Sequence, residues 1–216
     1  MKHASQIEPA GEAKVKPPTR RTLARQQTRA KVLAAARRLF SEQGYEGATI
    51  RDIATAAGMS TGAVFANFTD KSDLFREIMF ADMEFLTTEM RRAVEQGKSV
   101  EDALLRMFMA GYAFYKTQLP LARAAFGVSW HAEDGRAHRD APQVKTMLEL
   151  VSGVLQQGVA DGQLAADAEV TLRTQMLFDT YLANFAQAIF DGWSLTDLET
   201  RSRDQIRILL AGARTA

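Results

Sequence analysis

The segment 49–68, TIRDIATAAGMSTGAVFANF, constrains the fold of this chain more than any other. Its first half places apolar residues at helical spacing on one face, at Ile50, Ile53, Ala54 and Ala57. Gly58 then suits the positive φ that often ends a helix, and Ser60 suits the cap of a second helix. Val64 and Phe68 point inward from that second helix. The segment therefore predicts a helix-turn-helix unit, whose second helix enters the major groove of DNA.

Charge is divided unevenly along the chain. Residues 1–72 carry 12 Lys and Arg against 6 Asp and Glu, whereas residues 73–216 carry 15 against 20. The stretch 16–40 holds eight basic residues and no acidic one. A basic end joined to an acidic remainder indicates that the basic end binds nucleic acid.

Composition sets the class of the remaining chain. A hydrophobic content of 46% over 216 residues supports a sizeable core. The absence of cysteine excludes disulfides, thiolate nucleophiles and Cys-ligated zinc. We see neither a signal peptide nor a run of about 18 apolar residues, so we expect a cytoplasmic protein that does not span a membrane.

Helical periodicity recurs along the whole sequence, and alternating strand patterns do not. We expect an all-α fold of about nine helices. Besides the two of the motif, the expected helices span about 24–43, 71–96, 100–118, 120–130, 142–160, 167–190 and 195–212. Gly44 is expected to end the first of them, and Asp70 and Ser99 to cap two others. The polar stretch 131–142 is expected to be a loop.

From about residue 28 to 79 the chain resembles the N-terminal domain of the tetracycline-repressor (TetR) family of transcriptional regulators. The matching run is RRLFSEQGYEGATIRDIATAAGMSTGAVFANFTDKSDLF. The positions that fit the family pattern are Phe40, Gly44, Tyr45, Thr49, Ile53, Ala54, Ala57, Gly58, Ser60, Gly62, Phe68, Lys71 and Leu74. The chain departs from the pattern at Phe65, where the family usually has Tyr, and at Asn67, where it usually has His or Tyr.

The resemblance implies a domain organisation and a function. We expect a disordered basic arm at 1–22, a three-helix DNA-binding domain at 23–70, and a helical ligand-binding and dimerisation domain at 71–216. The implied function is a repressor that binds a palindromic, double-stranded DNA operator as a dimer and is released by an apolar or amphipathic small-molecule effector.

The residues expected to contact DNA lie on three parts of this region. They are Arg20, Arg21, Arg25, Thr49, Arg51, Ser60, Thr61, Gly62, Ala63, Phe65, Asn67 and Lys71. The arginines of the arm, Thr49 and Lys71 are expected at phosphates, and Thr61 and Ala63 at thymine methyl groups. Three readings stay open at this stage: a solvated arm rather than a DNA-binding one, Arg51 serving only solubility, and Phe65 packing inside the domain.

The C-terminal part supplies candidates for a ligand pocket and a dimer interface. The pocket candidates are Met107, Phe108, Tyr112, Tyr115, Phe126, Trp130, His131, Phe178, Tyr181, Asn184 and Phe185. For each of them, ordinary helix packing is the alternative. The resemblance implies a homodimer through the last two helices, which carry Leu172, Met176, Leu177, Tyr181, Phe185, Ile189, Leu195, Leu198, Ile206, Leu209 and Leu210. From the sequence alone, packing in the core of a single subunit is favoured over an interface for these residues.

Two other functions compete with a ligand-responsive repressor. An enzyme is disfavoured because we find no phosphate-binding loop and no nucleophile motif. The loose cluster of His131, Glu133, Asp134 and His138 lacks metal-ligand spacing, so we expect no metal and no cofactor. The second alternative is a helical dimeric DNA-binding factor that is regulated by a protein partner instead of a small ligand.

Overall fold

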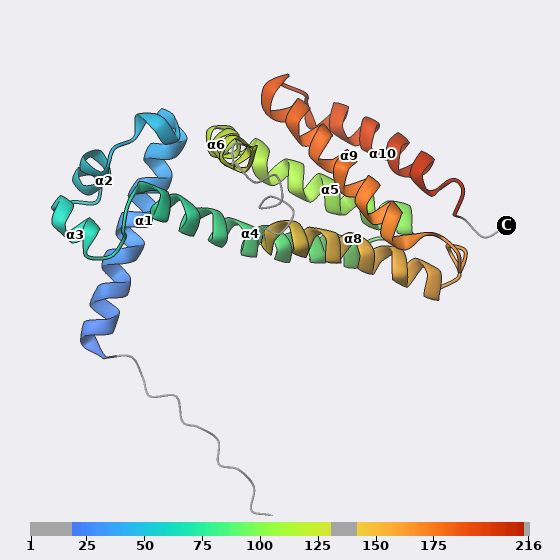
Figure 1. Cartoon of the computed structure of the whole chain (residues 1–216), viewed down its shortest axis with the longest axis horizontal. Helices are drawn as coiled ribbons and strands as arrows, with labels where there is room; N and C mark the ends of the chain where they lie inside the picture. Colours follow the sequence, from blue (N-terminus) through green and yellow to red (C-terminus); the bar gives the residue numbers. More distant parts are fainter. Residues whose placement is uncertain (1–18, 131–141, 214–216) are drawn as a thin grey trace, which may run out of the picture.

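The computed structural model describes residues 19–130 and 142–213, except for the side chains of 126–130, 142 and 143. This part of the chain forms nine helices and no strand, which confirms the all-α prediction (Figure 1). The helices are α1 (Arg20–Gly47), α2 (Ile50–Ala56), α3 (Thr61–Phe65), α4 (Lys71–Glu95), α5 (Val100–Lys116), α6 (Leu119–Trp130), α8 (Pro142–Ala160), α9 (Val170–Phe190) and α10 (Leu195–Leu210).

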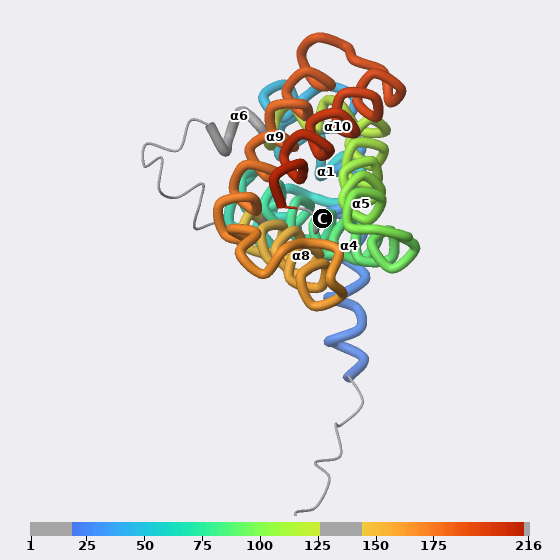
Figure 2. The backbone as a smooth tube through the Cα atoms, turned by 90° about the vertical axis from the view of Figure 1, so that its right-hand side faces the viewer, coloured from blue at the N-terminus to red at the C-terminus, as the bar shows by residue number. Residues whose placement is uncertain are grey.

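The helices form two groups that share α4. Helices α1, α2 and α3 lie together at one end, and α4 runs from them into the second group (Figure 1). There α4 packs against α5 and α8, while α9 packs against α8 and α10 (Figure 2). Helix α6 contacts both α1 and α9, so it also bridges the two groups.

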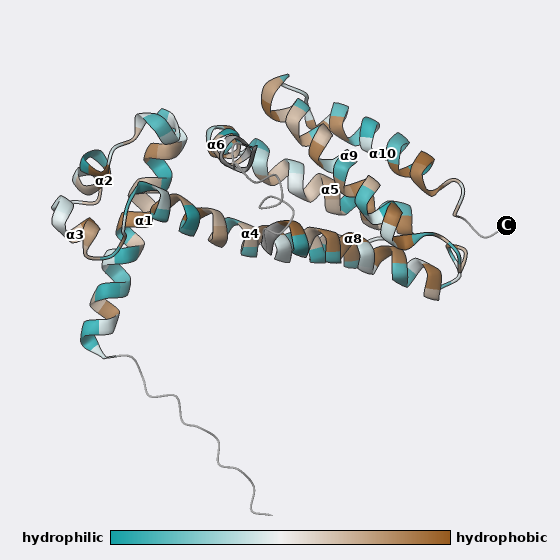
Figure 3. Cartoon of the chain, in the orientation of Figure 1, coloured by the Kyte–Doolittle hydropathy of each residue, from teal (hydrophilic) through white to brown (hydrophobic). Residues whose placement is uncertain are grey.

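Two separate hydrophobic cores correspond to these groups. The first contains buried residues of α1, α2 and α3, three residues at the start of α4 (Leu74, Phe75 and Ile78), and Leu121 of α6. The second begins at Leu86 of α4 and continues through α5, α8, α9 and α10. The change from one core to the other therefore falls inside α4 rather than at its first residue. Hydrophobic and hydrophilic patches lie next to each other on these helices (Figure 3), as amphipathic packing requires.

Side-chain caps explain where several helices begin. An oxygen of the N-cap residue accepts a hydrogen bond from a backbone N–H in the first helical turn, which would otherwise lack a partner. The residues that do this are Thr19, Thr49, Ser60, Asp70, Ser99 and Ser194. The caps predicted at Ser60, Asp70 and Ser99 are thus confirmed.

The first helix differs from its prediction at both ends. It begins at Arg20, because Thr19 caps it, so the expectation that residues 20–22 belong to a disordered arm was wrong. Residues 1–18 lie outside the described part of the chain. Gly44 takes a φ of 77°, which breaks the regular helix as predicted, and a short turn then continues to Gly47. In addition, α9 begins at Val170 instead of about 167, after Glu169 in a left-handed conformation.

None of the helices in the described ranges is both long enough and apolar enough to cross a membrane.

Candidate nucleic-acid interface

The turn between α2 and α3 depends on Gly58 and on backbone hydrogen bonds. Gly58 has a φ of 69°, a left-handed conformation that strains residues with a Cβ atom. The N–H of Met59 donates to the carbonyl oxygen of Ala54 at 2.9 Å. Ile53 and Val64 are fully buried between the helices. The predicted helix-turn-helix is therefore confirmed, and it holds α3 at the surface.

One side of α3 faces outward and is free of intramolecular packing. Thr61, Gly62 and Phe65 are exposed, and Ala63 is half-buried. The Phe65 residue is 56% exposed, so the reading that places it inside the domain's packing does not hold. This face offers one hydroxyl, small groups and one aromatic ring. Such groups suit thymine methyls and close backbone approach better than bidentate recognition of base edges.

Asn67 follows α3 and is turned back toward the protein. Its Nδ2 donates to the carbonyl oxygen of Ala63 at 3.0 Å, while its buried Oδ1 has no hydrogen-bond partner. One N–H of the amide is left for another acceptor. The expected contact of Asn67 with DNA stays a prediction.

Arg29 fixes the end of α3 against α1 and α4, a role that the sequence did not indicate. Its Nη1 donates to the carbonyl oxygen of Asn67 at 2.7 Å, and its Nη2 pairs with Glu77 of α4. The guanidinium also lies over the ring of Phe68, 4.3 Å from the ring centroid. One residue of the basic stretch therefore positions the recognition helix from within the protein. Its three partners are 38 to 48 residues away, which hides the role from local sequence patterns.

Lys71 is held in a similar way. Its Nζ donates to the carbonyl oxygen of Tyr45 at 2.8 Å and lies 4.4 Å from the centroid of the Tyr45 ring. Only about a quarter of its side chain is exposed, at 24%. The ammonium therefore ties the start of α4 to the last turn of α1. A phosphate contact from Lys71 stays a prediction. The phosphate would have to bind an ammonium that already contacts Tyr45.

Thr49 and Asp52 form a capping box at the start of α2. The Thr49 hydroxyl accepts from the N–H of Asp52 at 3.2 Å and donates to the Asp52 carboxylate at 2.5 Å. The carboxylate in turn accepts from the N–H of Thr49 at 3.3 Å. The predicted phosphate contact of Thr49 is untested, but its hydroxyl already has partners and a negative charge lies beside it.

A groove runs between the first turns of α1 and the end of α3. It has a volume of about 570 Å³ and is lined by Arg21, Thr22, Arg25, Ala66 and Asn67. Arg21 and Arg25 are one helical turn apart and therefore project from the same side of α1. Arg20 and Arg51 are exposed too, and within the described residues none of these four arginines has an ion-pair partner. Free guanidinium groups beside the recognition helix suit backbone phosphates.

The pocket candidates of the C-terminal part come together as a layer of packed rings. Tyr112 stacks on Tyr181 with ring centroids 4.9 Å apart and planes within 14°. Phe108 lies 5.1 Å from Tyr181, and Tyr115 lies 4.6 Å from Phe185. Met107 and Phe178 belong to the same buried core. The side chains of Phe126 and Trp130, and the whole of His131, lie outside the described part.

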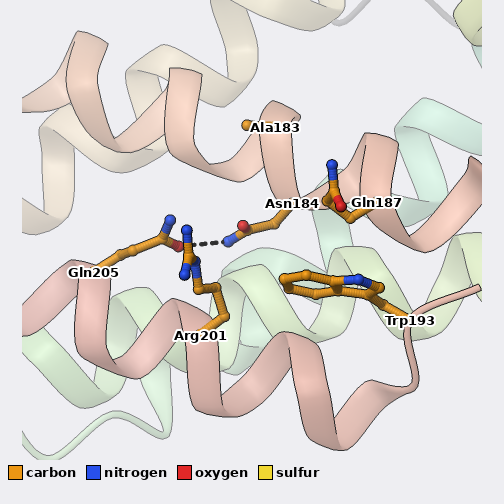
Figure 4. A pocket seen from close by; sticks show the side chains of 6 residues that line it. All are labelled: Ala183, Asn184, Gln187, Trp193, Arg201 and Gln205. Carbon is orange, nitrogen blue, oxygen red and sulfur yellow. Dashed lines mark hydrogen bonds between the residues drawn. The ribbon is translucent and has the colours of Figure 1, made fainter. Parts of the chain in front are cut away.

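Asn184 lies at the edge of this layer, next to the Tyr112 hydroxyl, and lines a cleft between α9 and α10 (Figure 4). The cleft has a volume of about 260 Å³ and is lined by Ala183, Asn184, Gln187, Trp193, Arg201 and Gln205. The buried Asn184 amide donates to Ser202 at 3.2 Å and is hydrogen-bonded to the side-chain amide of Gln205 at 2.7 Å. These bonds give Asn184 a structural role in joining the two last helices.

Arg37 links the two cores through a nearly buried carboxylate. Its guanidinium binds both oxygens of Asp82 on α4, with Nη1 at 3.0 Å from Oδ2. The same Nη1 donates to Gln118, between α5 and α6, at 3.2 Å. Asp82 is 6% exposed and is the one buried charged residue in the described chain. Arg123 of α6 extends the connection by donating to the carbonyl oxygen of Ile189 on α9 at 3.0 Å.

No group of three or more His, Asp or Glu side chains in the described residues is arranged to hold a metal ion. The cluster of His131, Glu133, Asp134 and His138 falls outside those residues.

A helix-turn-helix with an exposed second helix and a flanking arginine groove defines a DNA-binding regulator. The profile of the family described as "Bacterial regulatory proteins, tetR family" matches residues 32–78. Residues 32–78 therefore form a DNA-binding domain of the TetR type.

Similar proteins extend the likeness beyond this domain. The chain is 29% identical over 172 residues to the transcriptional repressor KstR2 of Rhodococcus jostii, covering 76% of this chain and 81% of that protein. It is 51% identical over 53 residues to the regulator AcrR of Shigella flexneri, covering 24% and 25%. The structure of the regulator FadR from Bacillus subtilis in complex with stearoyl-CoA shares the fold, with a TM-score of 0.70 at 20% identity, over 85% of this chain and 98% of that one.

Proposed function

We propose that this regulator represses transcription by binding a palindromic operator as a homodimer, and that an apolar or amphipathic small molecule releases it. The observation that carries this proposal is the arrangement around α4. The first turns of α4 pack in the first core, with the helix-turn-helix. The rest of α4 packs in the second core, which contains the aromatic layer. A shift of α4 caused by a ligand would therefore move α3. We place this activity in the cytoplasm, where the DNA is.

On DNA, α3 would lie in the major groove with Thr61, Ala63 and Phe65 toward the bases. Arg21 and Arg25 would then face the phosphates beside the groove, with Arg51 as a further contact. Ser60 and Gly62 would let the backbone at the start of α3 approach the DNA closely. The charge and exposure of these residues support this docking.

A dimer is supported by the apolar residues that α9 and α10 leave exposed. These residues are Leu172, Met176, Phe190, Leu195 and Ile208. By contrast, most residues predicted to serve either the core or the interface are buried within the subunit. Those residues are Leu177, Tyr181, Phe185, Ile189, Leu198, Ile206 and Leu210. A two-fold dimer would place its two α3 helices about 34–36 Å apart, at successive major grooves.

The effector site is proposed in the second core, among the aromatic rings of α5 and α9. Apolar pockets with a few polar groups are the usual small-molecule sites, and FadR of Bacillus subtilis holds stearoyl-CoA in the same fold. Because the two sites would be coupled, operator DNA must weaken effector binding by the same factor as the effector weakens DNA binding.

The proposal is tested by selecting operator fragments from genomic DNA with the purified chain and measuring their affinity by fluorescence anisotropy. We expect sequence-specific binding that falls steeply as salt rises. Addition of an apolar or amphipathic compound, such as a long-chain acyl-CoA, should release the DNA. Equal affinity for selected and scrambled fragments would contradict the proposal.

A further inference from the structure

Two hydroxyl groups on α9 are buried without a hydrogen-bond partner. Tyr181 and Thr174 are each 5% exposed, and neither the Oη of Tyr181 nor the Oγ1 of Thr174 has a partner. An unpaired buried polar group costs about 1–3 kcal/mol, so native proteins keep few of them. The two residues are seven positions apart, which puts them on one face of α9 with Cα atoms about 10 Å apart along the axis.

Thr174 differs from other threonines on these helices. Thr28, Thr55, Thr88, Thr180 and Thr200 each donate to the carbonyl oxygen four residues earlier. That bond satisfies a threonine hydroxyl inside a helix without any outside partner. The buried hydroxyl of Thr174 lacks this bond, so no group in the described part of the chain satisfies it.

The Tyr181 hydroxyl lies against the backbone of α5 and beside a methionine. A Cβ atom built on Gly111 would collide with Tyr181 Oη and would come within 2.5 Å of Met90 Cε. The hydroxyl and the Met90 side chain are thus neighbours at this point. Met90 is unbranched and can adopt several conformations, so it can yield its space to another apolar group.

The surroundings of this hydroxyl favour an uncharged ligand. The titratable groups that act on Tyr181 are Tyr115 and Tyr112, and burial raises the pKa of Tyr181 well above 10. The hydroxyl is therefore a neutral donor at physiological pH. The nearly buried Asp82 is already paired with Arg37. A ligand carboxylate would lose its hydration here without a cationic partner, whereas a carbonyl or ether oxygen needs only the donated hydrogen bond.

We propose that Tyr181 Oη donates a hydrogen bond to an uncharged acceptor oxygen of the effector, which enters the space that Met90 fills. The effector class is a neutral, flat, mainly apolar compound, because Tyr181 and Phe185 present parallel rings with planes within 4°. Thr174 supplies a second polar contact along α9. This inference rests on the proposed effector site of the C-terminal part.

The first test uses the chain without any ligand. Tyr181→Phe and Thr174→Val remove a hydroxyl that has no partner, so each should raise the melting temperature, by about 2–4 °C. Tyr112→Phe is the matched control: its hydroxyl donates to the carbonyl oxygen of Tyr181 at 3.3 Å, and its removal should lower the melting temperature. A lower melting temperature for Tyr181→Phe would show that its hydroxyl has a partner, and would overturn the proposal.

The second test uses three flat probes and isothermal titration calorimetry. 9-Fluorenone carries a carbonyl, fluorene lacks it, and fluorenone-4-carboxylate adds a negative charge. The unaltered chain should prefer fluorenone to fluorene by roughly three- to tenfold. Tyr181→Phe should abolish that preference, and Tyr45→Phe, in the DNA-binding part, should keep it. Persistence of the preference in Tyr181→Phe, tightest binding of the carboxylate, or binding of none of the probes would overturn the inference.

Operator release separates this inference from the proposed function. If stearoyl-CoA releases DNA while no flat probe binds, the ligand-responsive function stands and the role of Tyr181 fails. If the probes bind with a Tyr181-dependent preference and leave operator affinity unchanged, the site stands and its role as the effector site fails.

Discussion

Arg37 of α1 and Asp82 of α4 form the ion pair that joins the two cores of the molecule. Asp82 lies between Ile78, in the first core, and Leu86, in the second. Any movement of α4 relative to α1 must strain or break this pair, together with the bond from Arg37 to Gln118. The pair is therefore placed to transmit a change in the second core to the recognition helix.

Asp82→Asn should lower the free energy of unfolding by about 1–3 kcal/mol. Breaking a fully buried pair typically costs about 3–5 kcal/mol, but the Arg37 side chain is 37% exposed and solvent screens part of the loss. Urea unfolding measures the difference. The matched control is Glu199→Gln, which breaks an exposed helical pair with Arg203 and should change stability by about 0.5 kcal/mol or less. Equal effects of the two substitutions would rule out a special role for the junction.

Phe65→Ala should weaken operator binding by about 1–2 kcal/mol, because the ring would lose the apolar surface that it buries against DNA. Stability should stay within about 0.5 kcal/mol, since the ring is exposed. Phe68→Ala, which removes a ring only three positions away that is 2% exposed, should instead destabilise the chain by about 3–5 kcal/mol. Anisotropy and thermal melting distinguish the two effects. Unchanged operator affinity of Phe65→Ala would remove this residue from the interface.

The double variant Arg21→Ala and Arg25→Ala should reduce the slope of log K against log salt by about 2, one for each lost phosphate contact. Loss of affinity should be similar for specific and nonspecific DNA, because phosphates carry no sequence information. Arg91→Ala, on the exposed side of α4 in the C-terminal part, is the control and should leave the slope unchanged. A slope that stays the same in the double variant would place the groove away from DNA.

Gly111→Ala should destabilise the chain by about 1–3 kcal/mol, because its Cβ would overlap Tyr181 Oη and crowd Met90. Gly153→Ala offers a control inside another helix, where nothing lies within 4 Å of the added Cβ. That substitution should stabilise by up to about 1 kcal/mol, the difference in helix propensity. Urea unfolding of both variants measures the change in the free energy of unfolding, which should have opposite signs in the two. If Gly111→Ala left the free energy of unfolding unchanged, α5 and α9 would have to separate easily at this point.

Stability should fall above pH 10. Burial raises the pKa of Tyr115 to about 12 and also raises the pKa values of Tyr112 and Tyr181 above the usual value near 10. A group with a raised pKa in the folded state stabilises the fold fully below its unfolded pKa, near 10, and loses that contribution as pH rises through the folded pKa. Absorbance at 295 nm should therefore show these three tyrosines ionising only together with unfolding. Their ionisation near pH 10 with the helical circular dichroism intact would contradict the packing of the aromatic layer.

Sequence alone predicted the helix-turn-helix well because its determinants are local. The spacing of Ile53, Ala54 and Val64, the glycine at 58 and the cap at Ser60 all act within a few residues. The roles of Arg29 and Lys71 could not be predicted in this way. Each depends on a backbone carbonyl more than 20 residues distant, at Asn67 and Tyr45, so a basic residue suited to phosphate turned out to be engaged within the protein.

For the C-terminal part, the sequence predicted where the helices lie but not which of their apolar residues are exposed. Periodicity identified the apolar residues of α9 and α10, and it could not assign Leu177 to the core and Leu172 to the surface. That assignment depends on which neighbouring helices cover each side of α9. The aromatic layer was likewise predictable as a set of residues, whereas the unpaired hydroxyl of Tyr181 emerges only from its packing against Gly111.

Dimethyl sulfate footprinting of a selected operator tests most directly whether paired α3 helices read the DNA, since it reports protection of guanine N7 in the major groove. We predict two protected patches on one face of the duplex, with centres about one helical turn, or 10 base pairs, apart, and loss of both in Phe65→Ala at limiting protein concentration. A single protected patch, or binding without any major-groove protection, would contradict the proposed mode of recognition.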